Sequence, residues 1–153
     1  MADSVLERRI LRPQPRARVF AFFADAGNLE ALTPPWLSFR ILSPRPIAMA
    51  AGTCIDYRIR LRGLALRWRS RIASWDPPER FVDEQVRGPY RRWVHEHRFI
   101  ERPDGTEVID LVRYSVLGGR MVDRLFVRRD LERIFEFRER RLRELLGASG
   151  DVG

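Results

Sequence analysis

The sequence WDPPERFVDEQVRGPYRRWVHEHRF, residues 75–99, holds two strand-like runs that carry polar side chains where a packed core would carry aliphatic ones. Successive side chains of a strand point to opposite faces of a sheet. The residues that share one face are Phe81, Asp83 and Gln85 in the first run and Trp93, His95, His97 and Phe99 in the second. Because a buried polar group without a partner costs about 1–3 kcal/mol, a face meant only for packing rarely carries such groups. The stretch therefore predicts a sheet face that lines a cavity, where a ligand or water completes the polar contacts.

Alternation of apolar and polar residues predicts further strands on both sides of this stretch, at residues 4–12, 38–41, 54–61, 64–72 and 106–117. After the first strand, Pro15 and the aromatic residues that follow predict a helix, and Asn28 is expected to cap a short second helix at residues 29–32. Beyond Gly118 the apolar period becomes 3.6, which predicts one long amphipathic helix. Its apolar side is expected to hold Leu125, Leu131, Ile134, Phe135, Leu142 and Leu145. This order of elements predicts an α+β fold with an antiparallel sheet.

The length of 153 residues suits a single domain, which we expect at residues 1–147, followed by a flexible C-terminal tail at residues 148–153. A hydrophobic content of 44% supports a folded globule over a disordered chain. Cys54 is the only cysteine, so no intramolecular disulfide can form. The sequence has neither a signal-peptide pattern nor an apolar run of about 18 residues. It therefore predicts a cytoplasmic protein without a membrane span.

The formal charge of +8 comes from 29 basic residues, all of them arginine, against 21 acidic ones. A basic surface can attract nucleic acids, anionic ligands or membrane surfaces. The alternative is a solvated surface in which arginines pair with the acids. We favour the solvated surface and expect no nucleic-acid partner. An interaction surface formed by the arginines of residues 58–71 stays open as a third hypothesis for the function.

Three segments resemble one protein family: NLEALTPPWLSFRI (residues 28–41), WDPPERFVDEQVRGPY (75–90) and RLFVRRDLERIFEFR (124–138). They are similar to bacterial ligand-binding SRPBCC proteins of the cyclase/dehydrase-like type, which belong to the START and Bet v 1-like superfamily. The resemblance implies a helix-grip fold, in which a curved seven-stranded antiparallel sheet wraps around the last helix and two short helices follow the first strand. It also implies an internal cavity for a hydrophobic or amphipathic small molecule, lipid-like or aromatic. Relatives include lipid carriers, hormone receptors and polyketide cyclases, so the fold alone does not define the activity.

If the resemblance holds, the inward-facing residues line that cavity as candidate ligand-binding residues. The expected aromatic wall consists of Tyr57, Trp68, Trp93, Phe99 and Phe135, and the expected polar contacts are Asp83, Gln85, His95, His97, Asp110 and Tyr114. For the aromatic residues, the alternative is plain core packing. For the polar residues, the alternative is an internal hydrogen-bond network that never touches a ligand.

Two functional hypotheses follow for the cavity. The first is a binding protein without a cofactor, and both a monomer and a homodimer are compatible with it. The second is a cyclase- or dehydrase-type enzyme in which His95 or His97 carries a proton and Asp83 or Asp110 orients the imidazole. Two histidines at i and i+2 of a strand also have a spacing found in metal sites. The resemblance gives no expectation of a metal, however, and we predict none.

Overall fold

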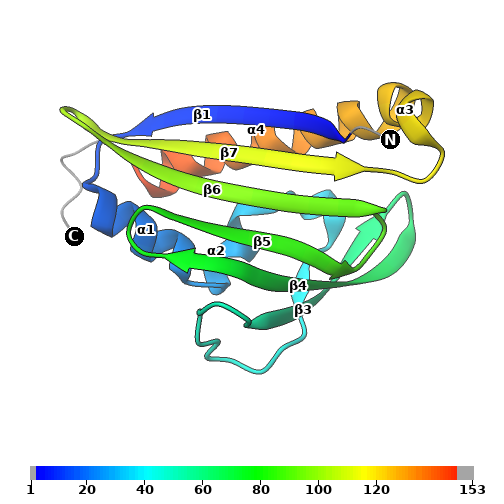
Figure 1. Cartoon of the computed structure of the whole chain (residues 1–153), viewed down its shortest axis with the longest axis horizontal. Coiled ribbons are helices and arrows are strands. Elements are labelled where there is room, and N and C mark those ends of the chain that lie inside the picture. Colours follow the sequence, from blue (N-terminus) through cyan, green and yellow to red (C-terminus); the bar gives the residue numbers. More distant parts are fainter. Residues whose placement is uncertain (1–2, 148–153) are drawn as a thin grey trace.

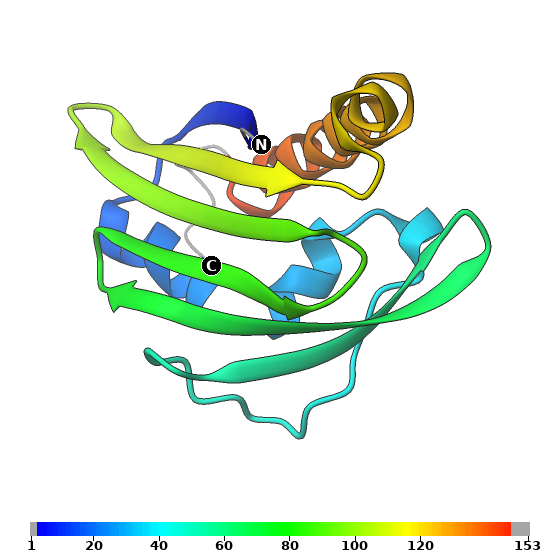
Figure 2. The same ribbon diagram turned by 45° about the vertical axis from the view of Figure 1, so that its right-hand side comes forward.

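Seven antiparallel strands form one curved sheet, and the C-terminal helix packs across its inner face (Figures 1 and 2). This computed structural model describes residues 3–147, so the tail expected at residues 148–153 lies outside the described residues. In chain order the elements are β1 (Ser4–Arg12), α1 (Arg16–Ala24), α2 (Gly27–Leu32), the 3₁₀ turn η1 (Pro35–Leu37), β2 (Arg40–Ile41), β3 (Cys54–Leu61), β4 (Leu64–Asp76), β5 (Arg80–Arg87), β6 (Arg92–Arg102), β7 (Gly105–Ser115), α3 (Gly119–Val122), the π-helical segment η2 (Asp123–Val127) and α4 (Arg128–Leu145). The predicted α+β helix-grip fold is confirmed.

The strand order is β1-β7-β6-β5-β4-β3-β2, so the two strands of the opening stretch, β5 and β6, lie inside the sheet. Register places Asp83 of β5 opposite His95 of β6, and His97 of β6 opposite Asp110 of β7. Directly opposed side chains of an antiparallel pair lie on the same face and within contact distance. The pairing therefore brings two carboxylates and two imidazoles together from three neighbouring strands.

Two element boundaries predicted between residues 27 and 41 differ from those in the structure. The second helix begins at Gly27, and Asn28 does not cap it. Instead, the Asn28 side-chain amide donates to the carbonyl oxygen of Phe22 at 2.8 Å, which satisfies an acceptor at the end of α1. The strand expected at residues 38–41 starts only at Arg40, because Ser38 adopts a left-handed conformation with φ of 46°.

The single C-terminal helix predicted after Gly118 is divided into α3, η2 and α4. A π-helical turn adds residues to one turn and shifts the phase of the side chains that precede it. Leu125 lies within this segment and is 57% exposed, contrary to the prediction. Leu145, near the end of α4, is 41% exposed, which also departs from the prediction. The buried stripe of α4 instead consists of Leu131, Phe135, Arg138 and Leu142.

Residues 3–147 contain three apolar clusters, and the two larger ones lie on either side of the polar side chains Asp83, His95, His97 and Asp110. The first joins α1 to the sheet around Phe20, Phe81 and Phe99. The second joins α4 to the sheet around Trp68 and Leu131. Burial of these side chains between the sheet and the helices α1 and α4 is the main source of stability.

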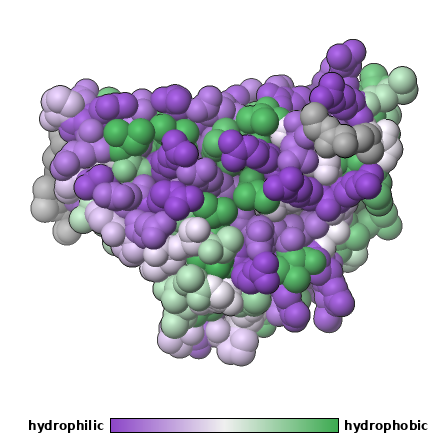
Figure 3. Space-filling view, in the orientation of Figure 1, coloured by the Kyte–Doolittle hydropathy of each residue, from purple (hydrophilic) through white to green (hydrophobic). Residues whose placement is uncertain are grey.

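The outer face of the sheet is predominantly hydrophilic, as Figure 3 shows. Its arginines pair with acids on neighbouring strands: Arg69 binds Asp56 through two hydrogen bonds, and Arg71 binds Glu84. Exposed pairs of this kind contribute little to stability, because water screens them. Within residues 3–147, none of the helices has the length and apolar character needed to cross a bilayer.

We predict that Gly105 cannot carry a side chain, because a Cβ there would lie 2.0 Å from the carbonyl oxygen of Arg12 at a φ of +146°. Gly105→Ala should lower the free energy of unfolding by about 3 kcal/mol or more, since both strand ends would have to move apart. Gly63 is the matched control, because its φ is +83° but a Cβ added there would meet no atom within 4 Å. Gly63→Ala should cost only about 1–2 kcal/mol. Equal losses for the two variants in urea unfolding would contradict the prediction.

Candidate functional site

A cavity of about 190 Å³ lies between the inner face of the sheet and the helices α2 and α4. Strands β3, β4, β5 and β6 contribute the sheet side, and Leu131, Ile134, Phe135 and Arg138 contribute the side of α4. Most of the wall is aliphatic or aromatic. Because such a wall cannot hydrogen-bond to water, it favours occupation by an apolar molecule.

Aromatic rings form the part of the wall nearest the β3–β4 hairpin. Tyr57 and Trp68 stack with their ring centroids 5.8 Å apart, and Trp93 meets Trp68 edge to face at 5.5 Å. Ser70 satisfies the polar atoms of two of these rings, because Trp68 Nε1 donates to its Oγ at 3.0 Å and the Tyr57 hydroxyl lies 2.9 Å from the same oxygen. Tyr57 and Trp68 therefore present apolar ring surfaces whose polar atoms already have a partner.

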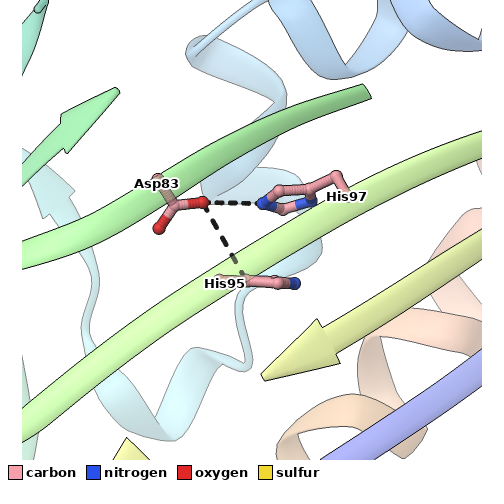
Figure 4. Close-up of side chains that lie close together, drawn as sticks. All are labelled: Asp83, His95 and His97. Atoms are coloured by element: carbon pink, nitrogen blue, oxygen red, sulfur yellow. Dashed lines mark hydrogen bonds and ion pairs between the residues drawn. The ribbon is translucent and has the colours of Figure 1, made fainter. Parts of the chain in front are cut away.

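The two histidines stack on each other between the carboxylates of Asp83 and Asp110. Figure 4 shows the two rings with Asp83. On one side, Asp83 Oδ2 lies 2.6 Å from His97 Nε2 and 4.0 Å from His95 Nδ1. On the other side, Asp110 Oδ1 lies 2.8 Å from His95 Nε2 and 3.5 Å from His97 Nδ1. Each imidazole thus has a carboxylate oxygen near both of its nitrogens. The arrangement fixes the orientation of both rings.

Helix α4 adds Arg138, a charged residue that sequence reasoning missed. It is 6% exposed, and its guanidinium donates to both oxygens of Asp110 at 3.3 and 3.4 Å. The same guanidinium lies over the ring of Phe23 at 5.3 Å. A signal was present in the sequence, since Arg138 follows Phe135 by three residues and precedes Leu142 by four, which places it inside the apolar stripe.

The surroundings of Asp110, Asp83 and His97 decide which of these three side chains carry a charge. Burial opposes ionisation of Asp110, but the nearby charge of Arg138 and the hydrogen bond from His95 outweigh it and lower the pKa of the carboxyl. Burial likewise opposes ionisation of Asp83, and the hydrogen bond from His97 is the main effect that nevertheless lowers its pKa. Burial, together with the neighbouring His95, lowers the pKa of His97 to about 4. At neutral pH both carboxylates are therefore ionised and His97 is neutral.

Seven of the eleven expected site residues lie on the cavity wall, namely Tyr57, Trp68, Asp83, Trp93, His95, His97 and Phe135. Whether they contact a ligand remains a prediction.

The other four expected residues do not line the cavity. The Gln85 side chain turns back to bind the backbone nitrogen and oxygen of Tyr90, which closes the turn between β5 and β6. Phe99 is covered by Phe20 of α1. The Tyr114 hydroxyl donates to Asp123 at 2.7 Å. Asp110 is 3% exposed and contacts the histidines and Arg138 without reaching the cavity surface.

Tyr90 and Ser70 also line the cavity, although sequence reasoning did not select them as site residues. Tyr90 follows Gly88 and Pro89 in a turn, and turn residues give no sign of which way a ring points. Ser70 lies on the same inward face of β4 as Trp68, so strand alternation contained the signal for it.

A curved antiparallel sheet that wraps over a long helix, with an apolar cavity between them, defines the helix-grip class of proteins. Within this class, the chain belongs to the polyketide cyclase / dehydrase and lipid transport family, whose model matches residues 13–139. The resemblance inferred from the three sequence segments is thereby confirmed. Members of this family act on polyketides or transport lipids, as its description states. Among curated proteins, none matches this sequence significantly.

Solved structures show the same fold at low sequence identity. Protein CV1439 from Chromobacterium violaceum is 13% identical and has a TM-score of 0.74, with 95% of this chain and 99% of that chain covered. Major latex-like protein 151 from Panax ginseng is 11% identical, with a TM-score of 0.72 and coverage of 97% and 100%. TTHA0849 from Thermus thermophilus is 22% identical, with a TM-score of 0.62 and coverage of 94% and 98%. These likenesses concern the fold.

We predict that Arg138 stabilises the protein by compensating the buried charge of Asp110. Arg138→Met should lower the free energy of unfolding by about 3–5 kcal/mol, because it leaves a buried carboxylate without its cation. Adding Asp110→Asn should recover part of that loss, since a neutral amide needs no counter-charge. Urea unfolding of both variants measures the effect.

Arg140→Met, on the exposed side of α4, is the matched control and should change stability by less than about 0.5 kcal/mol. A double variant that is no more stable than Arg138→Met would show that charge compensation is not the role of this arginine.

Proposed function

We propose that the protein binds a hydrophobic or amphipathic small molecule, lipid-like or aromatic, in the cavity between the sheet and α4. The observation that carries the proposal is a wall made mostly of aliphatic and aromatic side chains, into which Asp83, His95, His97 and Arg138 bring one buried group of polar side chains. Pockets for small organic molecules combine these two features, because the wall supplies affinity and a few polar groups fix orientation. Membership of a family described by lipid transport and polyketide chemistry supports the same proposal.

The wall favours a flat or unbranched apolar body. Stacked and edge-on rings from Tyr57, Trp68 and Trp93 present π surfaces at one end of the cavity. Burial of an apolar ligand contributes about 25 cal/mol per Å² removed from water. Since the Tyr57 hydroxyl and Trp68 Nε1 already bind Ser70, a ligand needs no polar group against these two rings, and Asp83 can bind a polar group of the ligand.

A second candidate function is proton transfer on a bound substrate, as in a cyclase or dehydrase. The observation that favours it is the pair of His95 and Asp110, in which a buried carboxylate holds the imidazole through Nε2 at 2.8 Å. This hydrogen bond leaves Nδ1 of His95 directed toward Asp83, on the cavity side, where it can accept a proton. His97 is held by Asp83 through Nε2 and keeps its Nδ1 away from the cavity, so it suits this role less well.

We predict that narrowing the cavity abolishes ligand binding. Ile134 of α4 is half-buried and lines the cavity, so Ile134→Trp should place an indole inside it. Binding of the neutral fluorescent probe N-phenyl-1-naphthylamine should weaken at least tenfold, about 1.4 kcal/mol. Glu136→Trp adds the same side chain to the exposed side of α4 and should bind the probe like the unmodified protein.

An unmodified protein that fails to bind the probe, or an Ile134→Trp variant that binds it unchanged, would contradict the proposed function. His95→Ala separates the two candidate functions once native mass spectrometry has identified a co-purifying molecule. A binding protein should keep most of its affinity for that molecule, whereas an enzyme should lose its turnover.

A further inference from the structure

Asp83, His95 and His97 present three metal-binding atoms on the cavity wall (Figure 4). The three atoms, one carboxylate oxygen and one nitrogen from each imidazole, all lie within 4.8 Å of one another. The two histidines occupy alternate positions of β6, and Asp83 is the direct cross-strand partner of His95. All three side chains therefore project from two adjacent, hydrogen-bonded strands, which hold them more rigidly than loops would.

The two distances from the Asp83 carboxylate to the imidazoles lie close to the separation of ligand atoms in a metal site, and the stacked rings of His95 and His97 would tilt apart to direct both nitrogens at one ion. Two ligand atoms at about 2.0–2.1 Å from a tetrahedral ion lie about 3.3 Å apart. Asp83 Oδ2 now lies 2.6 Å from His97 Nε2 and 4.0 Å from His95 Nδ1, values that lie on either side of that separation. A rotation of the Asp83 carboxylate toward His95 would make the two distances similar without moving either strand.

Asp110 supplies the support that metal-bound histidines usually have behind them. Its oxygen lies 2.8 Å from His95 Nε2, which donates to it, and Nδ1 of the same ring faces Asp83. A carboxylate behind the far nitrogen of an imidazole fixes the ring and its tautomer for metal binding. The Asp110 carboxylate lies in this position behind His95.

His97 provides a second, independent observation. Its Nδ1 is one of the buried side-chain atoms in residues 3–147 that have no hydrogen-bond partner, and the residue is 5% exposed. The nearest acceptor is Asp110 Oδ1 at 3.5 Å. If a metal ion took Nε2, the proton of the ring would move to Nδ1 and could then bind Asp110. Metal binding would thus give a partner to an atom that lacks one.

The charges of the group also favour a cation. This buried group contains two carboxylates, Asp83 and Asp110, and the guanidinium of Arg138 pairs with Asp110. The chain contains only two histidines, and both belong to this group. Cys54, the single cysteine, is exposed on β3, so it does not compete within the cavity.

We propose that Asp83, His95 and His97 bind one divalent transition metal ion of the Zn²⁺ or Fe²⁺ class, with a remaining coordination position open to the cavity. Two imidazoles and one carboxylate suit these ions and not Ca²⁺ or Mg²⁺, which prefer oxygen ligands. The site goes beyond the binding of an organic molecule, and it departs from the absence of a metal expected from the sequence. An ion at this position would polarise an oxygen of a molecule bound in the cavity.

The test is a titration of the full, untagged chain with Co²⁺, followed by visible absorption, and with Zn²⁺, followed by calorimetry. We expect saturation at one ion per chain. His97→Ala and the nearly isosteric Asp83→Asn should each weaken binding at least tenfold, because each removes one ligand. Glu84→Gln on the outer face of β5 and Cys54→Ser should bind metal like the unmodified chain.

Nitrogen-15 NMR of the unmodified chain gives a readout that does not depend on variants folding. Zn²⁺ should move the His97 proton from Nε2 to Nδ1 and leave the His95 proton on Nε2. The proposal is overturned if the unmodified chain shows no saturable binding, if binding survives Asp83→Asn unchanged, or if the His97 proton stays on Nε2 in the presence of Zn²⁺. None of these readouts requires the organic ligand, so they are separate from the test of the cavity.

Discussion

The buried charge of Asp110 is the constraint on which the packing between the sheet and α4 depends. A charge at 3% exposure is stable only with compensating partners, and Asp110 finds them in His95 of the neighbouring strand and Arg138 of α4. These contacts join β6, β7 and the C-terminal helix at one point between the two apolar clusters. The contact between Arg138 and Asp110 joins α4 to the sheet at that level, and the same helix forms one wall of the cavity.

The two faces of the sheet use charge in different ways. On the outer face, arginines and acids pair across strands in water, where each pair adds little to stability and keeps the surface hydrophilic. On the inner face, few charges are present, but each is buried and held by several partners. The arginine-rich composition therefore belongs mainly to the solvated side, while the functional features depend on Arg138 and its neighbours.

The buried group of polar side chains in the cavity wall connects the proposed functions. An organic molecule in the cavity, a proton acceptor at His95 and a metal ion at the three-residue site would all use the same side chains on β5 and β6. The shared origin is the cross-strand register, which places Asp83 against His95 and His97 against Asp110. The same cavity could thus support binding or catalysis, depending on whether an organic molecule, a substrate or a metal ion lies beside Asp83.

The periods of apolar residues are local properties of the chain, so the sequence by itself determined the order of strands and helices. Strand alternation also determined that Asp83, His95 and His97 point inward. It did not determine which inward residues border open space, because that depends on what packs against them. Phe99 became core because α1 covers it, and Gln85 turned away because its amide closes a turn onto Tyr90. The pairing of Asp110 with Arg138, 28 residues apart, and the π-helical turn that contains the exposed Leu125 likewise depended on how α4 docks. Such contacts join segments distant in sequence, and only the tertiary structure decided them.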